Sequence, residues 1–571
     1  MEPRYPRRDR KPSSRYDKNF VTTLVDHEAQ TDSYVESDDE DIANIMVDYC
    51  YRVFEVPKTY QQAISCEESQ GWQHAMESEM NSLEENGTYS LVPLPKGRKA
   101  IGSRWVYTVK LGTDGEEQLK ARCVAKGFSQ IADIDYHETF SPTARLTSIR
   151  MFMQIAVEQS MVVHQMDFNC AYLNADIDAE IYMKQPEGFK KDPGLVCKLN
   201  KSLYGLKQSG RLWNGMLDKF LKEQNFVNSL ADTCVYTKSD GKSKLILLVW
   251  VDDLIIAAND MQVLKLFKLS LTQNFKMKDL GIISHFLGIE FTVQNDFISM
   301  KQPRYIEKVL DKYKMSDCNP KSIPCNPGIN KELSHDSKIL NDVRLYRGMV
   351  GSLIYVMTAT RPDLCYVVNL LSQHMASPTK AHLNLCKQVL KYLKGTKFYE
   401  LKYCKSDGGP KLTGFCDSDW GASSNRRSTS GYCYFLNKNG PLISWRSKKQ
   451  REVVALSSCE AEYIALTDAM KEANFLRQLL ADMTGEERKI VDLYADNQGA
   501  ISLSKNPVHH KRTKHIDIRY HFIRLEVQSG IVNIMYVPSA SNIADMFTKP
   551  LPKPKLTQFE CIRGGKTGEG G

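Results

Sequence analysis

Two short apolar runs that flank a pair of acids form the clearest hydrophobic pattern in the chain. Residues 245–251 and 254–258 are almost entirely aliphatic or aromatic, and Asp252 and Asp253 stand between them. Two β-rich runs around a two-residue break predict a β-hairpin that is buried on both faces. Adjacent carboxylates at the tip of a buried hairpin are costly unless a cation, such as a divalent metal with oxygen ligands, compensates them. A polar hairpin tip with Asp as a turn former is the alternative.

A second hairpin is predicted nearer the N-terminus. Residues 103–110 and 118–127 have strand-like patterns and are joined by a turn that contains Asp-Gly. Lys110 and Arg122 come from opposite arms, so they can close over an anion such as a triphosphate, Lys as a point charge and Arg as a bidentate fork. Lysine also occurs on solvated strand edges for other reasons, and this pattern alone leaves both interpretations open.

Further polar positions follow strand-like or Gly-rich segments. Asp167 ends the short strand pattern of residues 162–168, and Tyr172 lies five residues later. Gln208 stands in a Gly-containing polar segment that opens a helix predicted over residues 212–224. Backbone donors and Gln208 can reach a nucleotide or a template there, whereas the segment taken without its neighbours is an ordinary loop.

The pattern changes in the C-terminal half. Residues 304–396 carry four apolar stripes at helical spacing, which predict a mostly helical region. From residue 414 the pattern predicts three strands, then a helix to about residue 480, then two more strands. An acid stands at the end of a strand or the start of a helix at each of four points. Any one such acid is explained as a helix N-cap or an exposed carboxylate.

Composition narrows the class of protein. With 571 residues, 42% apolar and 25% charged, the chain has the composition of a soluble globular protein of about three or four domains. The formal charge of +8 is concentrated between residues 96 and 126 and between 504 and 524, as in a phosphate-binding surface or a solvated charged face. The 15 cysteines include no C-x-x-C pair, which indicates reduced intracellular thiols. No run approaches a membrane span of about 18 apolar residues, and no signal-peptide core is present.

The order and spacing of Asp167, Tyr172, Gln208 and the Asp252-Asp253 pair resemble the palm of a reverse transcriptase. Four stretches, with the sequences KAR, QPEGF, LYGLKQS and FLGI, resemble copia-type long-terminal-repeat retrotransposons, and the similarity runs from about residue 72 to 551. The resemblance implies that Asp167, Asp252 and Asp253 bind two Mg²⁺ ions, with Mn²⁺ as an alternative. It also implies that Lys110 and Arg122 contact the triphosphate, that Gln208 contacts nucleotide or template, and that Tyr172 excludes a 2′-hydroxyl.

The C-terminal pattern is similar to a ribonuclease H domain. The family residues carried across are Asp417, Glu460, Asp496 and Asp545, which would hold a second pair of Mg²⁺ ions for attack on an RNA phosphodiester. Glu462 is expected to be a surface neighbour of Glu460, because residues two apart on a helix point about 200° apart. Many cellular relatives carry a histidine loop before the last Asp. This chain has none at that position, and its absence is expected to slow product release.

Three local features stand beside the family pattern. Trp250 and Gly210 replace the Tyr and Pro that are usual there, and the indole keeps an aromatic wall but loses a hydroxyl. The histidine-rich run 509–521 invites a zinc site, but its spacing and the lack of a nearby Cys favour a basic helix start against a hybrid backbone.

We therefore expect a multidomain α/β (α+β) protein, with a fingers-palm-thumb polymerase followed by a ribonuclease H-like domain. It would use an RNA template, a DNA primer and dNTPs, degrade the RNA/DNA hybrid, and bind no membrane. Integrase and capsid products of the same element are expected as further partners. The protein is expected in the cytoplasm, within virus-like particles. It is also expected to enter the nucleus together with the DNA product. The expected division is a disordered linker resembling an integrase tail (1–60), fingers and palm (61–295), helical thumb or connection (296–405), ribonuclease H-like domain (406–552) and disordered tail (553–571).

The rival hypothesis is a catalytically inactive, domesticated or truncated remnant that only binds nucleic acid or a partner. All seven acids are intact, and a remnant free of selection should have lost some of them. The chain contains no aspartic protease motif and no zinc-binding integrase head, so it is expected to be the 3′ part of a polyprotein.

Overall fold

The computed structural model describes residues 56–111, 117–335, 338–406, 408–421, 426–437, 440–451, 454–505 and 522–563. The predicted linker therefore lies almost wholly outside the described residues, as does the histidine-rich run. The chain forms two compact units, the first made of Met1–Arg145 with Cys170–Leu221 and the second of Leu146–Asn169 with Lys222–Gly571. The predicted multidomain α/β class is confirmed. The expected segment 61–295 is divided between the two units, because residues 146–169 and 222–295 belong to the second.

The first unit is built on a long hairpin covered by a helix. Strands β2 (Ser103–Leu111) and β3 (Glu117–Ala125) pair in register as predicted. Helix α4 (Ser69–Glu85) packs on β3 and buries Trp72, Met76, Met80 and Leu83, the stripe expected from the sequence. The ring of Tyr107 meets Trp72 edge-on at 5.2 Å, which closes this core. The other elements are α3 (Tyr60–Ser65), β1 (Tyr89–Pro93), β5 (Tyr182–Met183), β6 (Leu195–Leu199), α6 (Ala171–Asn174) and the start of α7 (Ser209–Glu223).

The second unit begins with a six-stranded sheet in the order β11-β4-β10-β9-β8-β7. Its central hairpin joins β9 (Lys244–Trp250) to β10 (Asp253–Ala258), and every residue of both strands except the two terminal polar ones is buried, as predicted. The strand β4 (Val162–Phe168) pairs with β10 on the other side. The remaining elements are β7 (Val227–Asn228), β8 (Val235–Ser239), β11 (Met277–Ile282), α5 (Leu146–Glu158) and α8 (Met261–Asn274).

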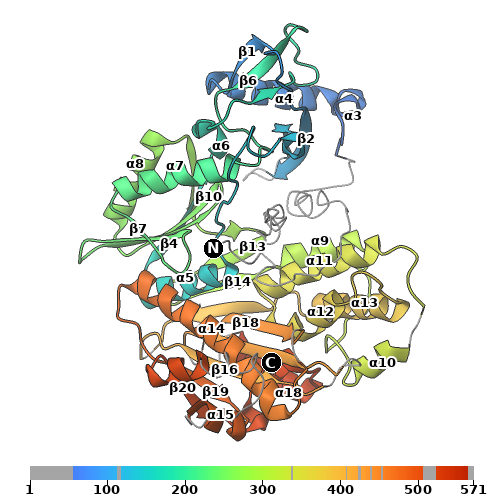
Figure 1. The fold of residues 1–571 in the computed structure, drawn as a ribbon, viewed down its shortest axis with the longest axis vertical. Helices are drawn as coiled ribbons and strands as arrows, with labels where there is room; N and C mark the ends of the chain where they lie inside the picture. The colour runs from blue at the N-terminus through green and yellow to red at the C-terminus, as the bar shows by residue number, and fades with distance from the viewer. Residues whose placement is uncertain are drawn as a thin grey trace, which may run out of the picture. The chain divides into compact units, whose positions relative to one another are not determined.

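A helical region follows, as the apolar stripes predict, together with a small sheet that they do not predict. The sheet has the order β12-β13-β14-β15, and β14 (Phe297–Lys301) pairs with β15 (Glu400–Cys404) from the far end of the helical region. The intervening helices are α9 (Pro303–Lys312), α10 (Ile329–His335), α11 (Arg344–Ala359), α12 (Cys365–Ser372) and α13 (Lys380–Gly395), coloured yellow-green to yellow in Figure 1. Strands β12 (His285–Phe286) and β13 (Ile289–Val293) complete the sheet.

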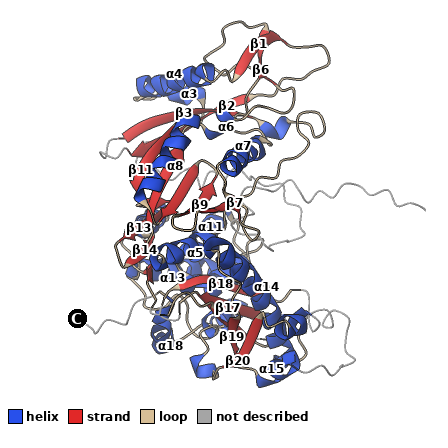
Figure 2. Cartoon of the chain, turned by 90° about the vertical axis from the view of Figure 1, so that its left-hand side faces the viewer, coloured by secondary structure: helices blue, strands red, loops and turns tan. Residues whose placement is uncertain are grey.

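The last part of the second unit is a five-stranded mixed sheet in the order β18-β17-β16-β19-β20. The long helix α14 (Ser458–Thr484) packs on β16 and β17 and is drawn beside the strands in Figure 2. Strands β16 and β19 are parallel, so their carboxyl ends meet at one edge of the sheet. The strands are β16 (Thr413–Ser418), β17 (Thr429–Phe435), β18 (Leu442–Lys449), β19 (Val491–Ala495) and β20 (Val532–Tyr536), followed by α17 (Asp545–Thr548) and α18 (Lys553–Gln558).

The C-terminal stretch differs from expectation. A disordered tail from residue 553 is wrong for residues 553–563, which form α18 and the 3₁₀ helix Phe559–Ile562. Phe559 and Ile562 are buried, and the carbonyl of Arg563 accepts a hydrogen bond from the N–H of Lys402 at 2.8 Å. These contacts stabilise a segment whose composition alone suggests disorder. Among the described residues, no helix has the length and apolarity needed to cross a membrane.

Arg150 joins three parts of the second unit. Its guanidinium donates to the carbonyl oxygens of Ile443 in β18 (2.7 Å) and of Thr358 and Ala359 at the end of α11 (2.6 and 3.1 Å), and it stacks 3.9 Å from the ring centroid of Trp445. Burial lowers the pKa of Arg150 to about 10. A cation at a helix carboxyl terminus is favourable because the last carbonyls carry partial negative charge.

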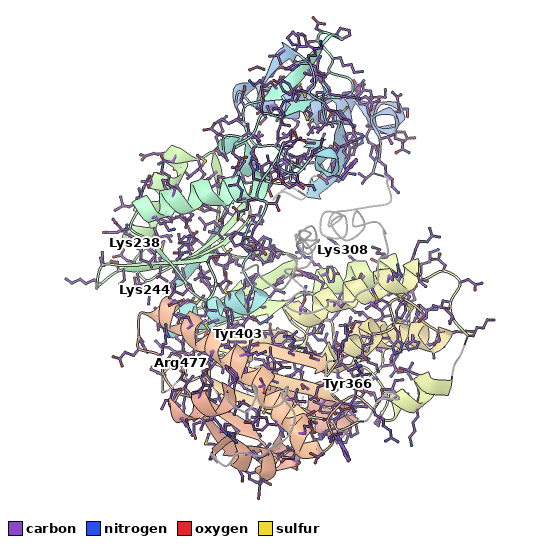
Figure 3. The ribbon with its side chains drawn as sticks, in the orientation of Figure 1. Lys238, Lys244, Lys308, Tyr366, Tyr403 and Arg477 are labelled. Atoms are coloured by element: carbon purple, nitrogen blue, oxygen red, sulfur yellow. The ribbon has the colours of Figure 1, made fainter. Side chains whose placement is uncertain are left out.

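Two further hydrogen bonds join other elements of the second unit. The labelled residues Tyr403 and Lys244 in Figure 3 donate to Leu442 (3.3 Å) and to Thr484 at the end of α14 (2.6 Å). Tyr403 therefore links β15 of the four-stranded sheet to β18, and Lys244 links β9 of the six-stranded sheet to α14, within one unit.

We predict that Arg150→Met lowers the unfolding free energy of the second unit by about 3 kcal/mol, because buried carbonyls lose their donor. Hydrogen exchange at α5 and β18 measures the change. Arg344→Met is the matched control: its guanidinium is 86% exposed and pairs with Asp342, so its loss should cost less than about 1 kcal/mol. Equal effects of the two variants would show that Arg150 does not join these elements.

Candidate active sites

The first acidic group lies at the tip of the buried hairpin. Asp253 is the direct partner of Asp167 in the β10–β4 register, so their side chains share a face of the sheet. The N–H of Phe168 donates to the carbonyl of Asp252 at 2.8 Å, which ties the hairpin turn to the end of β4. All three carboxylates therefore belong to one end of two neighbouring strands, as the sequence predicts. They are partly exposed, as a site that admits a substrate must be.

The turn of this hairpin is strained. Val251 has a φ of 54°, a left-handed conformation that β-branched residues rarely adopt. In a two-residue hairpin loop with positive φ at the first central residue, glycine is the usual occupant. Strain of this kind persists where the surroundings enforce it and is concentrated at functional sites. Trp250, the residue that departs from the family pattern, faces Asp253 in the ladder and is only 9% exposed.

A row of cationic and aromatic side chains lies in the first unit. The guanidinium of Arg122 lies 4.9 Å from the ring centroid of Tyr204, whose ring meets Tyr172 edge-on at 4.7 Å. Gly205 permits this arrangement: its φ is +90°, and a Cβ there would lie 2.2 Å from the carbonyl oxygen of Ala125. The structure thus brings Arg122 and Tyr172 together through Tyr204, which the sequence analysis did not assign to the site.

Two predicted binding residues lie differently from expectation. Lys110 pairs with Gln118, so it is four register positions from the partner of Arg122, about 13 Å along the strand. Lys120 pairs at the intervening position and is nearer to Arg122.

Gln208 is fully buried: its amide nitrogen donates to Asp135 at 2.8 Å, and its oxygen accepts from Gln130 at 3.0 Å. The structure therefore does not place Gln208 for direct contact with a ligand. Its side chain instead stabilises the loop that follows β3.

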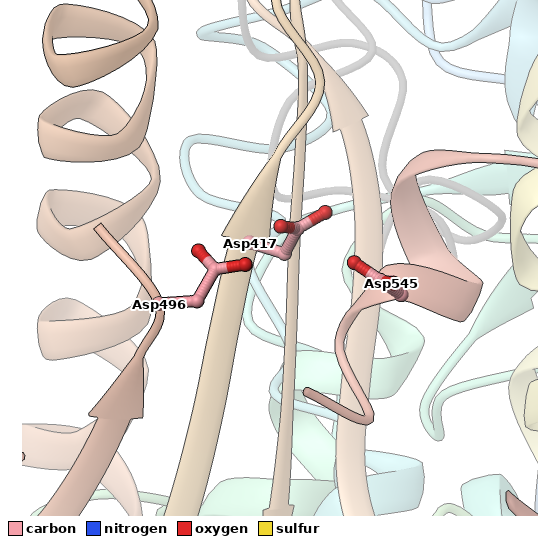
Figure 4. Close-up of side chains that lie close together, drawn as sticks. All are labelled: Asp417, Asp496 and Asp545. Atoms are coloured by element: carbon pink, nitrogen blue, oxygen red, sulfur yellow. The ribbon is translucent and has the colours of Figure 1, made fainter. Parts of the chain in front are cut away.

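The second acidic group gathers at the carboxyl ends of β16 and β19. Asp417 ends β16 and is 2% exposed, Asp496 follows β19, and Asp545 opens α17 and is 1% exposed. One ligand oxygen from each lies within 4.8 Å of the others, and Figure 4 shows the three carboxylates turned toward one another. The three aspartates are brought together as predicted.

The glutamate assignment is wrong. Glu460 is the third residue of α14, and its carboxylate accepts the N–H of Leu456 at 2.7 Å, while the Ser457 side chain accepts the N–H of Glu460 at 3.2 Å. Glu462, expected on the surface, is 6% exposed. Its carboxylate feels the charges of Asp417 and Asp496.

The sequence contained a signal for this register. Ser457 and Glu460 match the S-x-x-E capping box, a pattern in which the glutamate is used by the helix terminus.

The electrostatics of the second group are those of crowded, buried anions. Burial and the neighbouring aspartates raise the pKa of Glu462 well above its usual range. Burial also raises the pKa of Asp417, against the lowering effect of Lys549, with Asp545 and Asp496 adding to the rise. Among the described residues, no group donates a hydrogen bond to Oε2 of Glu462. A buried carboxylate oxygen without a donor is suited to a cation.

Two lysines that the sequence did not single out approach Asp545. Lys549 lies 2.7 Å from its Oδ1, and Lys555 of α18 forms an ion pair with Oδ2. Thr548 donates to Asp417 from the same short helix. Four carboxylates thus face two ammonium groups, and full ionisation leaves two negative charges unbalanced. The donors are all oxygens, which is the set that Mg²⁺ prefers.

Comparison with known families and sequences agrees with this geometry. A family model described as "Reverse transcriptase (RNA-dependent DNA polymerase)" matches residues 86–327. The Pol polyprotein from transposon TNT 1-94 of Nicotiana tabacum is 39% identical over 519 residues, covering 88% of this chain and 38% of that protein. The Pol polyprotein from transposon RE1 of Arabidopsis thaliana is 41% identical over 508 residues, covering 88% and 34%. The chain therefore spans little more than a third of the length of these relatives.

A shorter relative is covered completely. The putative transposon Ty5-1 protein of Saccharomyces cerevisiae is 34% identical over 313 residues, which is 54% of this chain and 100% of that protein. Among solved structures, the foamy viral protease-reverse transcriptase in complex with double-stranded DNA gives a TM-score of 0.48 at 12% identity, over 85% of this chain and 71% of that one.

We predict that Glu462→Gln changes the pH dependence of stability of the metal-free protein. A carboxyl whose pKa is raised on folding stabilises most below its unfolded pKa, near 4.5, and that stability is lost as the pH rises toward the folded value. The variant lacks this loss, so its free energy of unfolding should match that of the wild type near pH 4.5. At higher pH the variant should be more stable than the wild type, by a difference that grows by at most about 1.4 kcal/mol per pH unit.

Thermal unfolding across pH in a chelator measures this difference. Glu460→Gln keeps an acceptor for the N–H of Leu456 and is the matched control, expected to follow the wild type. A Glu460→Gln profile that departs from the wild type while Glu462→Gln does not would reverse the assignment of the two glutamates.

Proposed function

Because this chain belongs to the family of Pol polyproteins of copia-type long-terminal-repeat retrotransposons, we propose that it copies RNA, and then DNA, into DNA and hydrolyses the RNA strand of the hybrid. The observation that carries the proposal is the presence of two acidic groups on two different sheets, each at the ends of neighbouring strands. One group serves nucleotidyl transfer and the other serves hydrolysis. Its substrates are an RNA template, a DNA primer, dNTPs and the RNA/DNA hybrid.

Both groups suit two Mg²⁺ ions, with Mn²⁺ as an alternative. Asp167, Asp252 and Asp253 would hold the metals for polymerisation, and Asp417, Glu462, Asp496 and Asp545 would hold those for hydrolysis. The oxygen-only donor sets and the unpartnered Oε2 of Glu462 support this fit. When bound, such ions neutralise phosphate charge and lower the pKa of the attacking water or hydroxyl.

The residues of the first unit bind and select the nucleotide in this proposal. Arg122 offers a planar guanidinium that can bind two phosphate oxygens. Because it already stacks on Tyr204, its side chain loses less conformational entropy when a phosphate binds. Lys120, two residues before Arg122 on β3, adds a second cation. Lys110 keeps its predicted role on the triphosphate. Tyr172 presents its ring to the sugar, where it leaves no room for a 2′-hydroxyl, and Tyr204 supports that ring.

The two lysines on Asp545 act within the proposed hydrolytic site. With the metals absent, Lys549 and Lys555 balance part of the negative charge of the group. With a substrate bound, ammonium groups in this position can attract the phosphate backbone to the acidic site. This role would compensate in part for the histidine loop that the chain lacks.

The first test separates the two activities. Asp252→Asn keeps the shape of the hairpin tip but removes one charge, so primer extension on an RNA template should fall by at least about 10²-fold while hybrid cleavage continues. Asp240→Asn, in the turn before β9, is the control and should leave both activities unchanged. Near-normal extension by Asp252→Asn would contradict the polymerase assignment and favour a remnant that only binds nucleic acid.

A second test concerns the choice of sugar. Tyr172→Ala removes the ring and should raise kcat/KM for ribonucleotides relative to deoxyribonucleotides by about 10-fold or more, because the steric exclusion is lost. Tyr172→Phe keeps the ring and should preserve the discrimination. If the ratio of the two kcat/KM values is the same in wild type and Tyr172→Ala, the selecting residue lies elsewhere.

A further inference from the structure

Trp420 is an exposed aromatic residue at the edge of the second acidic group. It lies three residues after Asp417, just beyond the end of β16, and is 57% exposed. Its indole Nε1–H donates to the carbonyl of Ala455 at 3.1 Å, in the segment that leads into α14. The polar edge of the ring is therefore fixed while much of the ring remains open to solvent. An indole held in this way loses little conformational entropy when a ligand packs on it.

Basic residues stand in the segments that neighbour this residue. The N–H of Gly421 donates to the Ser428 side chain at 3.2 Å, which brings the Trp420 segment beside Arg427. Thr429, which follows Ser428, pairs with Lys449 in the β17–β18 ladder. Burial lowers the pKa of Lys449, and the nearby Arg427 and Arg451 lower it further, against the raising effect of Asp419. Three cations are thus close enough to influence one another.

Apolar side chains complete the surface. Leu456 is 80% exposed and Val454 47% exposed, and both flank Ala455, the residue that holds the indole. We name the whole set the Trp420 surface: Trp420, Arg427, Lys449, Arg451, Val454 and Leu456.

The chemistry of the Trp420 surface fits a nucleic acid. Proteins bind nucleic-acid strands by combining aromatic rings, on which bases or sugars pack, with cations that follow the phosphate backbone. An acidic protein would also attract the cations. The position favours nucleic acid, because the surface lies at the end of the strand that carries Asp417, where a hybrid must lie to be cleaved.

We propose that the Trp420 surface binds the RNA/DNA hybrid at the hydrolytic site. The indole packs on a sugar or base of the hybrid, and Arg427, Lys449 and Arg451 contact phosphates. Trp420 is thus a substrate-binding residue: its contact with the duplex is the same before and during cleavage, so it contributes to KM and not to kcat. This inference rests on the proposed ribonuclease function.

The experiment measures cleavage of a labelled hybrid by the full chain, with KM and kcat determined separately at several salt concentrations. Trp420→Ala removes the binding free energy that one aromatic ring contributes. It should therefore raise KM about 10-fold with kcat nearly unchanged. Trp420→Phe should recover most of the loss. Phe398→Ala removes an aromatic ring that is 66% exposed elsewhere in the same unit, and it should leave KM unchanged.

Salt separates the aromatic contribution from the cationic one. Lys449→Gln should reduce the slope of log affinity against log salt by about 0.9, the value for one phosphate contact, whereas Trp420→Ala should leave the slope unchanged. Hybrid binding in a chelator, where no cleavage occurs, provides the affinity.

Three results would overturn the proposal. An unchanged KM and affinity for Trp420→Ala would mean that the surface does not contact the hybrid, as expected if it binds an acidic protein. A lower kcat with unchanged KM would mean that the indole only holds the loop at Ala455. A Trp420→Phe variant as weak as Trp420→Ala would exclude ring packing. Failure of the proposed function is distinct: the wild type would then bind the hybrid without cleaving it.

Discussion

Uncompensated negative charge at the ends of buried strands is the constraint on which this protein depends. The strand β16 places Asp417 where water is scarce, and the partly exposed tip of β9 and β10 gathers three like charges. Such groups are stabilised when they hold a proton or face a cation. The second acidic group uses both. The raised pKa of Glu462 favours its protonated form, and two lysines pair with Asp545. The same constraint makes both groups suited to metal ions.

The framework that holds these groups is a set of hydrogen bonds and strand pairings within the second unit. Hydrogen bonds from Arg150 connect the helix α5, which packs on β14 and β15 of the four-stranded sheet, to β18 of the five-stranded sheet and to the end of α11. The strand β15 returns from the helical region to pair with β14, and Arg563 adds a further contact to β15. The two acidic groups therefore belong to one compact unit, in which the polymerising and hydrolysing sites would be built on joined sheets.

The sequence predicted features that depend on local pattern and missed those that depend on tertiary contacts. The hairpin at Asp252 follows from the apolar pattern, and the grouping of Asp167 with it follows from the family resemblance; the strand pairing agrees with both. Glu460 was chosen over Glu462 because the phase of α14 against the sheet cannot be read from spacing, although the capping-box pattern indicated it. The burial of Gln208 and the order of the segment around Lys555 depend on partners more than 9 residues away in sequence, Asp135 for the first and Asp545 for the second.

Crystals grown with Mn²⁺ would test the central claim most directly, because anomalous scattering locates the metal independently of activity. The account predicts peaks between Asp417, Glu462, Asp496 and Asp545, and at the hairpin tip beside Asp167, Asp252 and Asp253, with Glu460 still bonded to the N–H of Leu456. Peaks bound through Glu460, or no peaks at saturating Mn²⁺ with Lys549 and Lys555 still paired to Asp545, would contradict it.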